Sequence, residues 1–255
     1  MLAIPADIVG DGLYSDHRFS QEYPSAGPPR VSFIVCALPR SGSSLLCELL
    51  ARTELAGAPT EFFEPNQRGA LERRWGVRTL DLYVREMLAR KTTPNGVFGL
   101  KTLYHQLVDA VGDTSPRDLF PSVRYVYIRR HDHVRQAVSF ARAIQTDQWA
   151  SEHPAGGADP VFDAAQIGEL IAWIRSEEAL WEEFFRREGS PLRLLYEDLV
   201  ESVDETLAQV LRFLDVDVPA GFQPPRPTLA KQADDLTERW VRRYLSLDAS
   251  SQAGS

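Results

Sequence analysis

A polar loop between two apolar runs carries the residues of this chain with the clearest chemical potential. Residues 31–35 form an apolar, β-branched run that predicts a strand, and residues 45–50 have the pattern of a helix. The loop between them reads Pro39-Arg40-Ser41-Gly42-Ser43-Ser44. A strand, a short polar loop and a helix N-terminus together aim backbone N–H groups at a phosphate. Arg40 adds a permanent cation, the serines add hydroxyl donors, and Gly42 lets the backbone approach a ligand closely.

This loop is not a Walker A motif. That motif, G-x-x-x-x-G-K-[ST], places a lysine directly before the hydroxyl residue. Here there is one glycine, and the cation is Arg40 in a different position. A tight strand-to-helix turn with serine caps would give the same pattern. From the loop alone, anion binding is therefore a hypothesis.

A second candidate anion site follows another apolar run. Residues 123–128 predict a strand that ends in Arg129 and Arg130, and residues 132–146 predict a helix that carries Ser139. A P-loop kinase usually has an aspartate at such a strand end to hold magnesium. Arginine and serine instead suit a second phosphate without a metal. Solvated arginines before a helix capped by Asp132 are the alternative, but two such sites on one sheet favour anion binding.

Composition limits the class of protein. The chain has 255 residues and a formal net charge of -8, which argues against binding to nucleic acid or anionic membranes. No apolar run approaches the ~20 residues of a membrane span, and the N-terminus lacks a signal-peptide pattern. Cys36 and Cys47 lack metal-ligand spacing, so we interpret them as buried thiols in a reducing compartment. These features predict a cytoplasmic enzyme without a metal.

Strand and helix patterns alternate along the chain, which predicts an α/β fold with a mainly parallel sheet. Residues 1–30 hold four prolines and little periodicity and are interpreted as an N-terminal extension. The main domain is predicted over 31–248, with a C-terminal tail at 249–255. The other expected elements are strands at 97–100 and 192–196, helices at 80–88, 167–185, 203–214 and 236–247, and loops at 56–65 and 151–160.

Three segments resemble motifs of sulfotransferases that use 3′-phosphoadenosine 5′-phosphosulfate (PAPS). PRSGSSL at 39–45 resembles their 5′-phosphosulfate loop, YIRRHDHVRQAVSF at 127–140 their 3′-phosphate motif, and LYEDL at 195–199 a further common segment. Within that superfamily, GAPTEFFEP at 57–65 and KQAD at 231–234 are similar to the bacterial trehalose 2-sulfotransferase group. The resemblance covers residues 31–245. It implies a P-loop-like three-layer fold, in which helices flank a central, mainly parallel sheet.

The resemblance also implies donor-binding residues. The loop residues Arg40, Ser41, Gly42, Ser43 and Ser44 would bind the 5′-phosphate and the sulfuryl group of PAPS. The 3′-phosphate and the adenine would be bound by residues from later in the chain. These are Arg130 and Ser139 for the 3′-phosphate, Tyr196 near the adenine, and Lys231 reaching the 3′-phosphate. Arg129 stays open as the alternative to Arg130.

The catalytic residues follow from the same resemblance. Glu61 matches the glutamate that serves as the general base in the trehalose group, and Arg40 would stabilise the bridging oxygen as it gains charge. Lys101 resembles the lysine of the Lys-Thr-His motif of eukaryotic cytosolic sulfotransferases, but Leu103 stands in the place of the histidine. His105 is the alternative base.

These expectations define a PAPS-dependent sulfotransferase that acts on a small-molecule hydroxyl, in a sugar, a glycolipid or a secondary metabolite. Ala58 stands where the resemblance implies an acidic residue, so the acceptor is predicted only as a class. A P-loop small-molecule kinase is disfavoured by the missing Walker lysine and the missing strand-end aspartate. A non-catalytic nucleotide-binding protein is disfavoured by the presence of Glu61 beside the intact loop. The oligomeric state is open, with a homodimer among the options.

Overall fold

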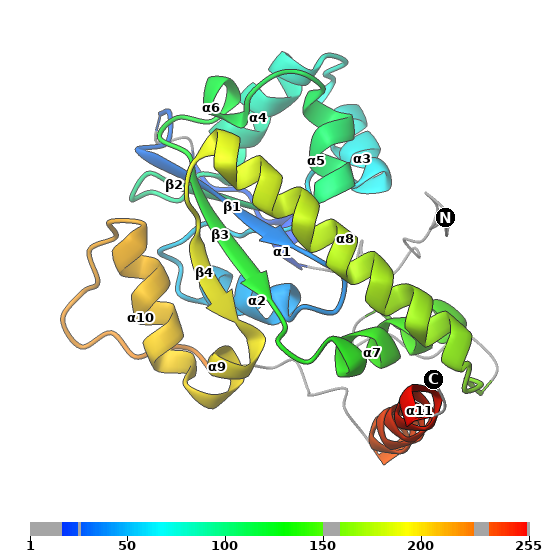
Figure 1. Cartoon of the computed structure of the whole chain (residues 1–255). Coiled ribbons are helices and arrows are strands. Elements are labelled where there is room, and N and C mark those ends of the chain that lie inside the picture. The colour runs from blue at the N-terminus through cyan, green and yellow to red at the C-terminus, as the bar shows by residue number, and fades with distance from the viewer. Residues whose placement is uncertain (1–16, 25–26, 150–158, 227–234, 254–255) are drawn as a thin grey trace.

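A parallel sheet of four strands forms the centre of the molecule (Figure 1). The computed structural model describes residues 17–24, 27–149, 159–226 and 235–253. Within them the strands lie in the order β2-β1-β3-β4, and every neighbouring pair is parallel. Their bounds are Val31–Ala37 for β1, Val97–Leu103 for β2, Arg124–Arg129 for β3 and Leu192–Leu195 for β4. The predicted strands are thus confirmed, each to within a few residues.

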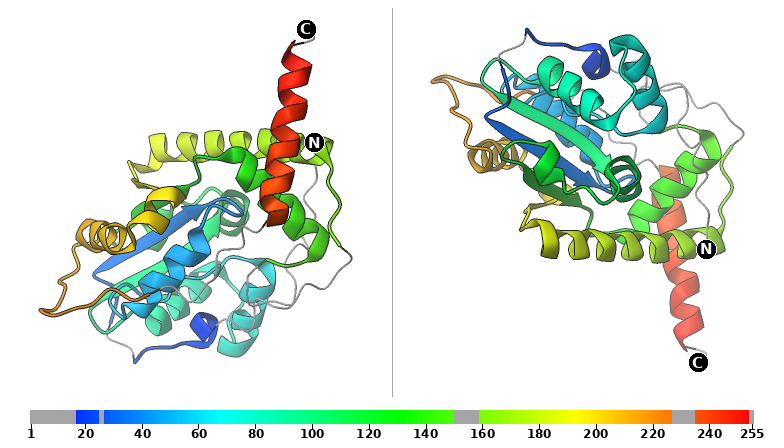
Figure 2. Two further views of the ribbon diagram at one scale, coloured as in Figure 1. Left: turned by 90° about the horizontal axis from the view of Figure 1, so that it is seen from below. Right: turned by 90° about the horizontal axis from the view of Figure 1, so that it is seen from above.

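Helices occupy most of the remaining described residues. Their bounds are α1 His17–Ser20, α2 Ser43–Arg52, α3 Pro65–Trp75, α4 Leu80–Lys91, α5 Tyr104–Val111, α6 Pro116–Leu119, α7 His133–Thr146, α8 Ala164–Glu188, α9 Tyr196–Glu201, α10 Val203–Phe213 and α11 Asp235–Ala253. Figure 2 shows α11 beside α7, with its C-terminal end extending away from the sheet. No helix in the described part of the chain is long and apolar enough to cross a membrane.

The sheet is covered on both faces because successive side chains of each strand point to opposite sides. In β1, Ile34 and Cys36 join one apolar cluster, which includes residues of α4, α5, α7 and α8. Phe33 and Val35 join the other cluster, with residues of α2 and α10. Figure 1 shows the long helix α8 on one side of the sheet and α2 on the other. The predicted three-layer α/β fold is therefore confirmed.

The strand order brings the two candidate anion sites together. β1 and β3 are neighbours, with Cys36 opposite Tyr127 in the register. Because the strands are parallel, the loops that follow them leave from the same edge of the sheet. The loop at 39–42 and the turn at 130–132 therefore emerge side by side.

Five helices were not predicted. Two of them, α1 and α6, have only four residues each, and α3 shows why a longer one was missed. Its sequence, PNQRGALERRW, is mostly polar and lacks an apolar stripe of helical spacing. It is specified instead by its ends. Glu64 caps the N-terminus, Pro65 occupies the first turn, and Gly76 ends the helix with a φ of 69°. The other two are α5 and α9, the latter starting at Tyr196, where we expected the fourth strand to end.

Candidate active site

The loop after β1 has the backbone conformation of a ligand cradle. Arg40 and Gly42 both have positive φ, 61° and 87°. For a non-glycine residue such as Arg40 this region is sparsely populated and costs energy, and such strain clusters at functional sites. Ser41 lies between them with its hydroxyl oxygen buried and without a hydrogen-bond partner among the described residues. The loop thus presents an unsatisfied buried donor in a strained turn.

The helix that follows begins without a side-chain cap. Its N-cap residue is Gly42, which has no side chain to accept from the first-turn N–H groups. An ordinary turn with serine caps was one interpretation of this loop, and it is wrong because Gly42 holds the N-cap position, Ser43 and Ser44 lie inside the helix, and no side chain caps its first turn. Uncapped N–H groups and the positive end of the helix dipole together attract an anion. Ser43 is buried in the first turn, and Ser44 is exposed beside it.

The side chain of Arg40 joins the first loop to the second site. Its Nε donates to Ser139 Oγ at 2.9 Å, and its Nη1 donates to the backbone carbonyl of Trp149 at 2.5 Å. Burial, together with the nearby charge of Arg130, lowers the pKa of Arg40 to about 10. Two residues that the resemblance assigned to different phosphates of the donor, Arg40 and Ser139, therefore touch each other.

Arg130 points inward against Tyr196. The guanidinium carbon of Arg130 lies 4.7 Å from the centre of the Tyr196 ring, a cation–π contact. Its Nε is buried without a hydrogen-bond partner and lies 3.8 Å from Glu197 Oε1. Arg129 is exposed. Of the two arginines, Arg130 is thus the one with the geometry of a binding residue.

Tyr196 also explains why residue 42 is a glycine. A Cβ at Gly42 would lie 2.3 Å from Cδ2 of Tyr196, so a larger residue would displace the ring. The neighbouring Glu197 accepts from the backbone N–H of His131 at 3.1 Å. Asp132 caps α7 by accepting from the backbone N–H of Arg135 at 2.9 Å, the cap that the alternative interpretation of this segment expected. These contacts hold the start of α9 against the loop at 39–42 and the turn at 130–132.

On the other side of the loop, Glu61 is held by a segment with an apolar anchor. The backbone N–H of Lys101 donates to the carbonyl of Thr60 at 2.9 Å, which docks the segment along β2. The rings of Phe62 and Phe63 are 0% and 3% exposed, and Tyr83 Oη donates to the Phe62 carbonyl at 2.6 Å. The two buried rings therefore anchor the segment that carries Glu61.

The Glu61 carboxylate has two partners. Lys101 Nζ lies 2.6 Å from Glu61 Oε1, and Gln106 Nε2 donates to Glu61 Oε2 at 2.8 Å. Burial by itself would raise the pKa of Glu61. The charge of Lys101 and the hydrogen bonds from Lys101 and Gln106 outweigh burial and leave that pKa below its ordinary value. Lys101 Nζ also lies 3.3 Å from Ser44 Oγ and so joins Glu61 to the first turn of α2.

The other potential bases have different environments. Glu64 is fully buried and accepts from the backbone N–H groups of Asn66 and Gln67, so it is occupied as the cap of α3. His105 is exposed on α5, and burial of part of its ring lowers its pKa despite the nearby charges of Asp109 and Glu61.

Gln106 was missed at the level of sequence. It is the third residue of α5, and its Oε1 also accepts from the backbone N–H of Leu103 at 3.0 Å. A glutamine three residues after a helix start is a known capping signal. It was not recognised here because α5 itself was not predicted. Lys231 lies outside the residues that the structure describes.

Comparisons with known proteins show what the chain is similar to. A family model described as Stf0 sulphotransferase matches residues 32–246. A trehalose 2-sulfotransferase of Mycolicibacterium smegmatis is 33% identical, with 84% of this chain and 94% of that protein covered. One of Mycobacterium tuberculosis is 31% identical, with 83% and 93% covered. Among solved structures, the sulfotransferase domain of the Synechococcus PCC 7002 olefin synthase has a TM-score of 0.50 at 16% identity, with 86% of this chain and 95% of that chain covered.

Proposed function

Because the chain belongs to the Stf0 sulphotransferase family and is a sulfotransferase, we propose that it transfers the sulfuryl group of PAPS to a hydroxyl of a sugar, a glycolipid or another natural product. The family membership confirms the resemblance that the motifs at 39–45 and 127–140 indicate. The names of the two mycobacterial relatives assign trehalose to those proteins. They support a sugar-like acceptor for this chain.

The described residues fit the proposed donor. PAPS carries phosphates at both ends of its ribose, so it needs two anion sites a short distance apart. The chain offers the uncapped start of α2 with the unsatisfied Ser41 hydroxyl, and next to it Arg130, whose Nε is also unsatisfied. The hydrogen bond between Arg40 and Ser139 supports two adjoining sites, because it joins a residue proposed for one phosphate to a residue proposed for the other.

The donor-side roles follow from this geometry. Arg40, Ser41, Ser43, Ser44 and the backbone at Gly42 would bind the 5′-phosphate and the sulfuryl group. Arg130 and Ser139 would bind the 3′-phosphate, and the Tyr196 ring beside Arg130 would flank the adenine. Lys231 is proposed for the 3′-phosphate on the resemblance alone.

The acceptor-side residues manage the proton. PAPS supplies an activated sulfuryl group whose departure leaves a phosphate. As the acceptor oxygen bonds to sulfur and the bond from sulfur to the bridging oxygen breaks, the hydroxyl proton passes to the Glu61 carboxylate. Gln106 holds one oxygen of that carboxylate and so orients the other.

Lys101 is placed to serve both partners of the reaction. Its ammonium group lies between Glu61 and the first turn of α2. A cation there stabilises negative charge on the bridging oxygen, while its pairing with Glu61 lowers the basicity of that carboxylate. Any movement of Lys101 toward the phosphosulfate would weaken this pairing and make Glu61 a stronger base.

One observation carries the proposal. The side chain of Lys101 bridges the Glu61 carboxylate and the first turn of α2, because its Nζ lies 2.6 Å from Glu61 Oε1 and 3.3 Å from Ser44 Oγ. The direct test incubates the protein with PAPS and a panel of hydroxylated sugars, glycolipids and natural products and detects sulfated products by mass. We expect sulfation of at least one sugar-like acceptor without added magnesium. Transfer from ATP that depends on magnesium would support the kinase alternative instead.

Binding distinguishes the remaining alternative. 3′-Phosphoadenosine 5′-phosphate (PAP) should stabilise the protein by about 2.7 kcal/mol at 100 times its Kd. AMP at the same concentration should stabilise it by much less, because only PAP engages Arg130 and Ser139. Equal stabilisation by PAP and AMP would contradict the 3′-phosphate site. Strong PAP binding with no sulfation across the panel would favour a non-catalytic nucleotide-binding protein.

A further inference from the structure

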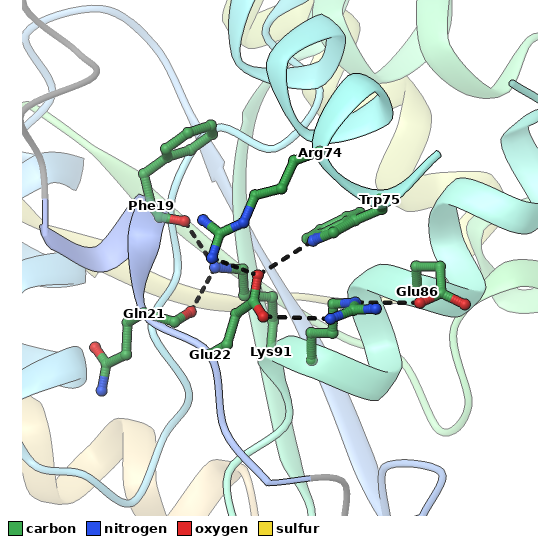
Figure 3. Close-up of polar contacts among 8 residues, drawn as sticks. Phe19, Gln21, Glu22, Arg74, Trp75, Glu86 and Lys91 are labelled. Carbon is green, nitrogen blue, oxygen red and sulfur yellow. Dashed lines mark hydrogen bonds and ion pairs between the residues drawn. The ribbon is translucent and has the colours of Figure 1, made fainter. Parts of the chain in front are cut away.

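A segment that the sequence assigned to the N-terminal extension is packed against the catalytic domain. We call residues 17–23 the strap. Its Phe19 is 8% exposed and belongs to the same apolar cluster as Phe62 and Tyr83. The backbone N–H of Tyr23 donates to the carbonyl of Arg90 at 2.8 Å, at the end of α4. Figure 3 shows the strap side by side with residues of α3 and α4.

A fully buried lysine holds the strap. Lys91 is 0% exposed, and its Nζ donates to the backbone carbonyl of Phe19 at 2.7 Å and to that of Gln21 (Figure 3). Burying an ammonium group is costly unless its N–H groups are satisfied. Burial accordingly lowers the pKa of Lys91 to about 8, although the charge of Glu22 opposes this shift. The chain has only three lysines among its 28 lysines and arginines, and one of them occupies this fully buried position.

A second set of contacts closes the strap over α3 and α4. Glu22 accepts from Trp75 Nε1 at 3.1 Å and pairs with Arg74 at 3.2 Å and Arg90 at 3.4 Å. The Trp75 ring in turn packs on Tyr83, with 5.6 Å between the ring centres. The strap is therefore fastened by a buried cation at one point and by a partly buried anion at another.

Both fastenings lead to the segment that carries Glu61. Lys91 Nζ lies 5.7 Å from the centre of the Phe62 ring, the residue directly after Glu61. Tyr83, which packs on Trp75, donates its hydroxyl to the Phe62 carbonyl. Phe62 is thus held from the side chain by Lys91 and from the backbone by Tyr83.

The other end of the strap reaches the donor side. Arg18 Nη1 lies 3.5 Å from the backbone carbonyl of Ser44, in the first turn of α2. Ser44 is also the residue whose hydroxyl contacts Lys101. The strap therefore spans from the segment that carries the base to the helix that faces the donor.

We propose that the strap is a positioning element of the acceptor side, and that Lys91 is the positioning residue through which it holds the Glu61 segment. The inference rests on the proposed role of Glu61 as the base. Lys91 touches neither substrate. It acts by keeping Phe62, and with it the carboxylate of Glu61, in place relative to Lys101. A strap that is docked is then a condition for turnover but not for binding of the nucleotide.

The test compares Lys91→Met with Arg85→Met, which replaces an exposed cation on the same helix by the same side chain. Each variant is measured for hydrogen exchange in the strap, for kcat and KM of an acceptor, and for the Kd of PAP. In Lys91→Met we expect faster exchange over residues 17–23 and a kcat lower by about tenfold to 10²-fold, the cost of a small misplacement of a catalytic group. The Kd of PAP should change less than about twofold, and Arg85→Met should behave as the wild type.

Two results would overturn the inference. Faster exchange in the strap with normal turnover would make the strap a structural element only. Unchanged exchange in Lys91→Met would mean that Lys91 does not hold the strap. If Lys91→Met does not fold, Glu22→Gln is measured instead, because it removes the pairing with Arg74 and Arg90 at a position that is not fully buried.

A parallel measurement separates this inference from the proposed base. Since Lys91 acts through Glu61, Lys91→Met should cost much less when Glu61→Gln is already present than in the wild type. Full additivity of the two losses would overturn the strap inference and leave Glu61 as the base. Normal turnover in Glu61→Gln alone would overturn both.

Discussion

The donor side and the acceptor side of this site hold charge in opposite ways. On the donor side desolvation lowers the pKa of the partly buried Arg40, and the nearby charges of Arg130 and Arg142 lower it further. On the acceptor side the buried carboxylate of Glu61 has a cation 2.6 Å away and an amide donor on its other oxygen. The donor side thus gathers arginines with one distant, partly exposed carboxylate, Glu197, 3.8 Å from Arg130, whereas the acceptor side pairs its charge closely.

This difference predicts a division of labour. Like charges that lie close together repel each other, and an anionic ligand offsets this repulsion. Most of the binding energy for the nucleotide should therefore come from the donor side. The acceptor side is already neutralised, and its substitutions should change the rate of transfer more than the affinity for nucleotide.

Glu61→Gln should lower turnover by roughly 10²–10⁴-fold, the usual range for loss of a general base. The amide keeps the size of the carboxylate but cannot accept the proton. Steady-state kinetics with a confirmed acceptor measure the loss, and titration with PAP should show nearly wild-type affinity. Normal turnover would show that Glu61 is not the base and would favour His105 in that role. Loss of both turnover and PAP binding would mean that Glu61 holds its segment together.

Arg130→Met should weaken PAP binding by roughly 10- to 100-fold, because a charge-assisted contact contributes about 1.5–3 kcal/mol. Affinity for AMP should change far less, since AMP lacks the 3′-phosphate. Arg129→Met is the matched control and should bind PAP normally, because Arg129 is exposed. Calorimetric titration checks both variants. A larger loss in Arg129→Met would exchange the two assignments.

Gly42→Ala should destabilise the protein by about 1–3 kcal/mol and weaken nucleotide binding as well. The φ of 87° disfavours a side chain, and a Cβ would meet Tyr196 at 2.3 Å. Thermal unfolding with and without PAP measures both effects. Gly76→Ala also removes a glycine with positive φ, 69°, but nothing lies within 4 Å of its Cβ position, so it should affect stability alone.

The smallest expected effect concerns pH. The folded-state pKa of Glu61 is below its ordinary value of 4.5, so Glu61 contributes stability that is present above that value and is lost as the pH falls through the folded-state pKa. Lys101→Met removes the main lowering influence and leaves burial, which raises the pKa. The wild type should therefore lose stability as the pH falls below about 4.5, whereas Lys101→Met, in which burial favours the protonated Glu61, should be less stable at neutral pH and lose less stability on acidification. An equal loss of stability on acidification in both proteins, measured by urea unfolding at each pH, would show that the ion pair does not control Glu61.

Local sequence was enough to predict the α/β fold with its parallel sheet, whereas the three layers and the chemistry were implied by the family resemblance. Apolar runs predicted all four strands. The polar residues after the first strand predicted the loop that contains Arg40 and Gly42. Asp132 before the helix at 133–146 is likewise a capping residue that the local sequence marks, and the structure shows it as the cap. These features depend on neighbours in the chain, which is why the sequence alone reveals them.

Long-range neighbours depended on the tertiary structure. The strand order β2-β1-β3-β4 is not written in any segment, and it is this order that brings Arg40 to Ser139 and Lys101 to the first turn of α2. Gln106 joined the site because the unpredicted helix α5 aims it at Glu61. The sequence of the strap has no periodicity that would indicate a packed segment. Its attachment comes from Lys91, some seventy residues later in the chain. Residue types determine which chemistry is available, whereas packing of distant segments decides which groups meet, because contact energies depend on proximity in space and not in sequence.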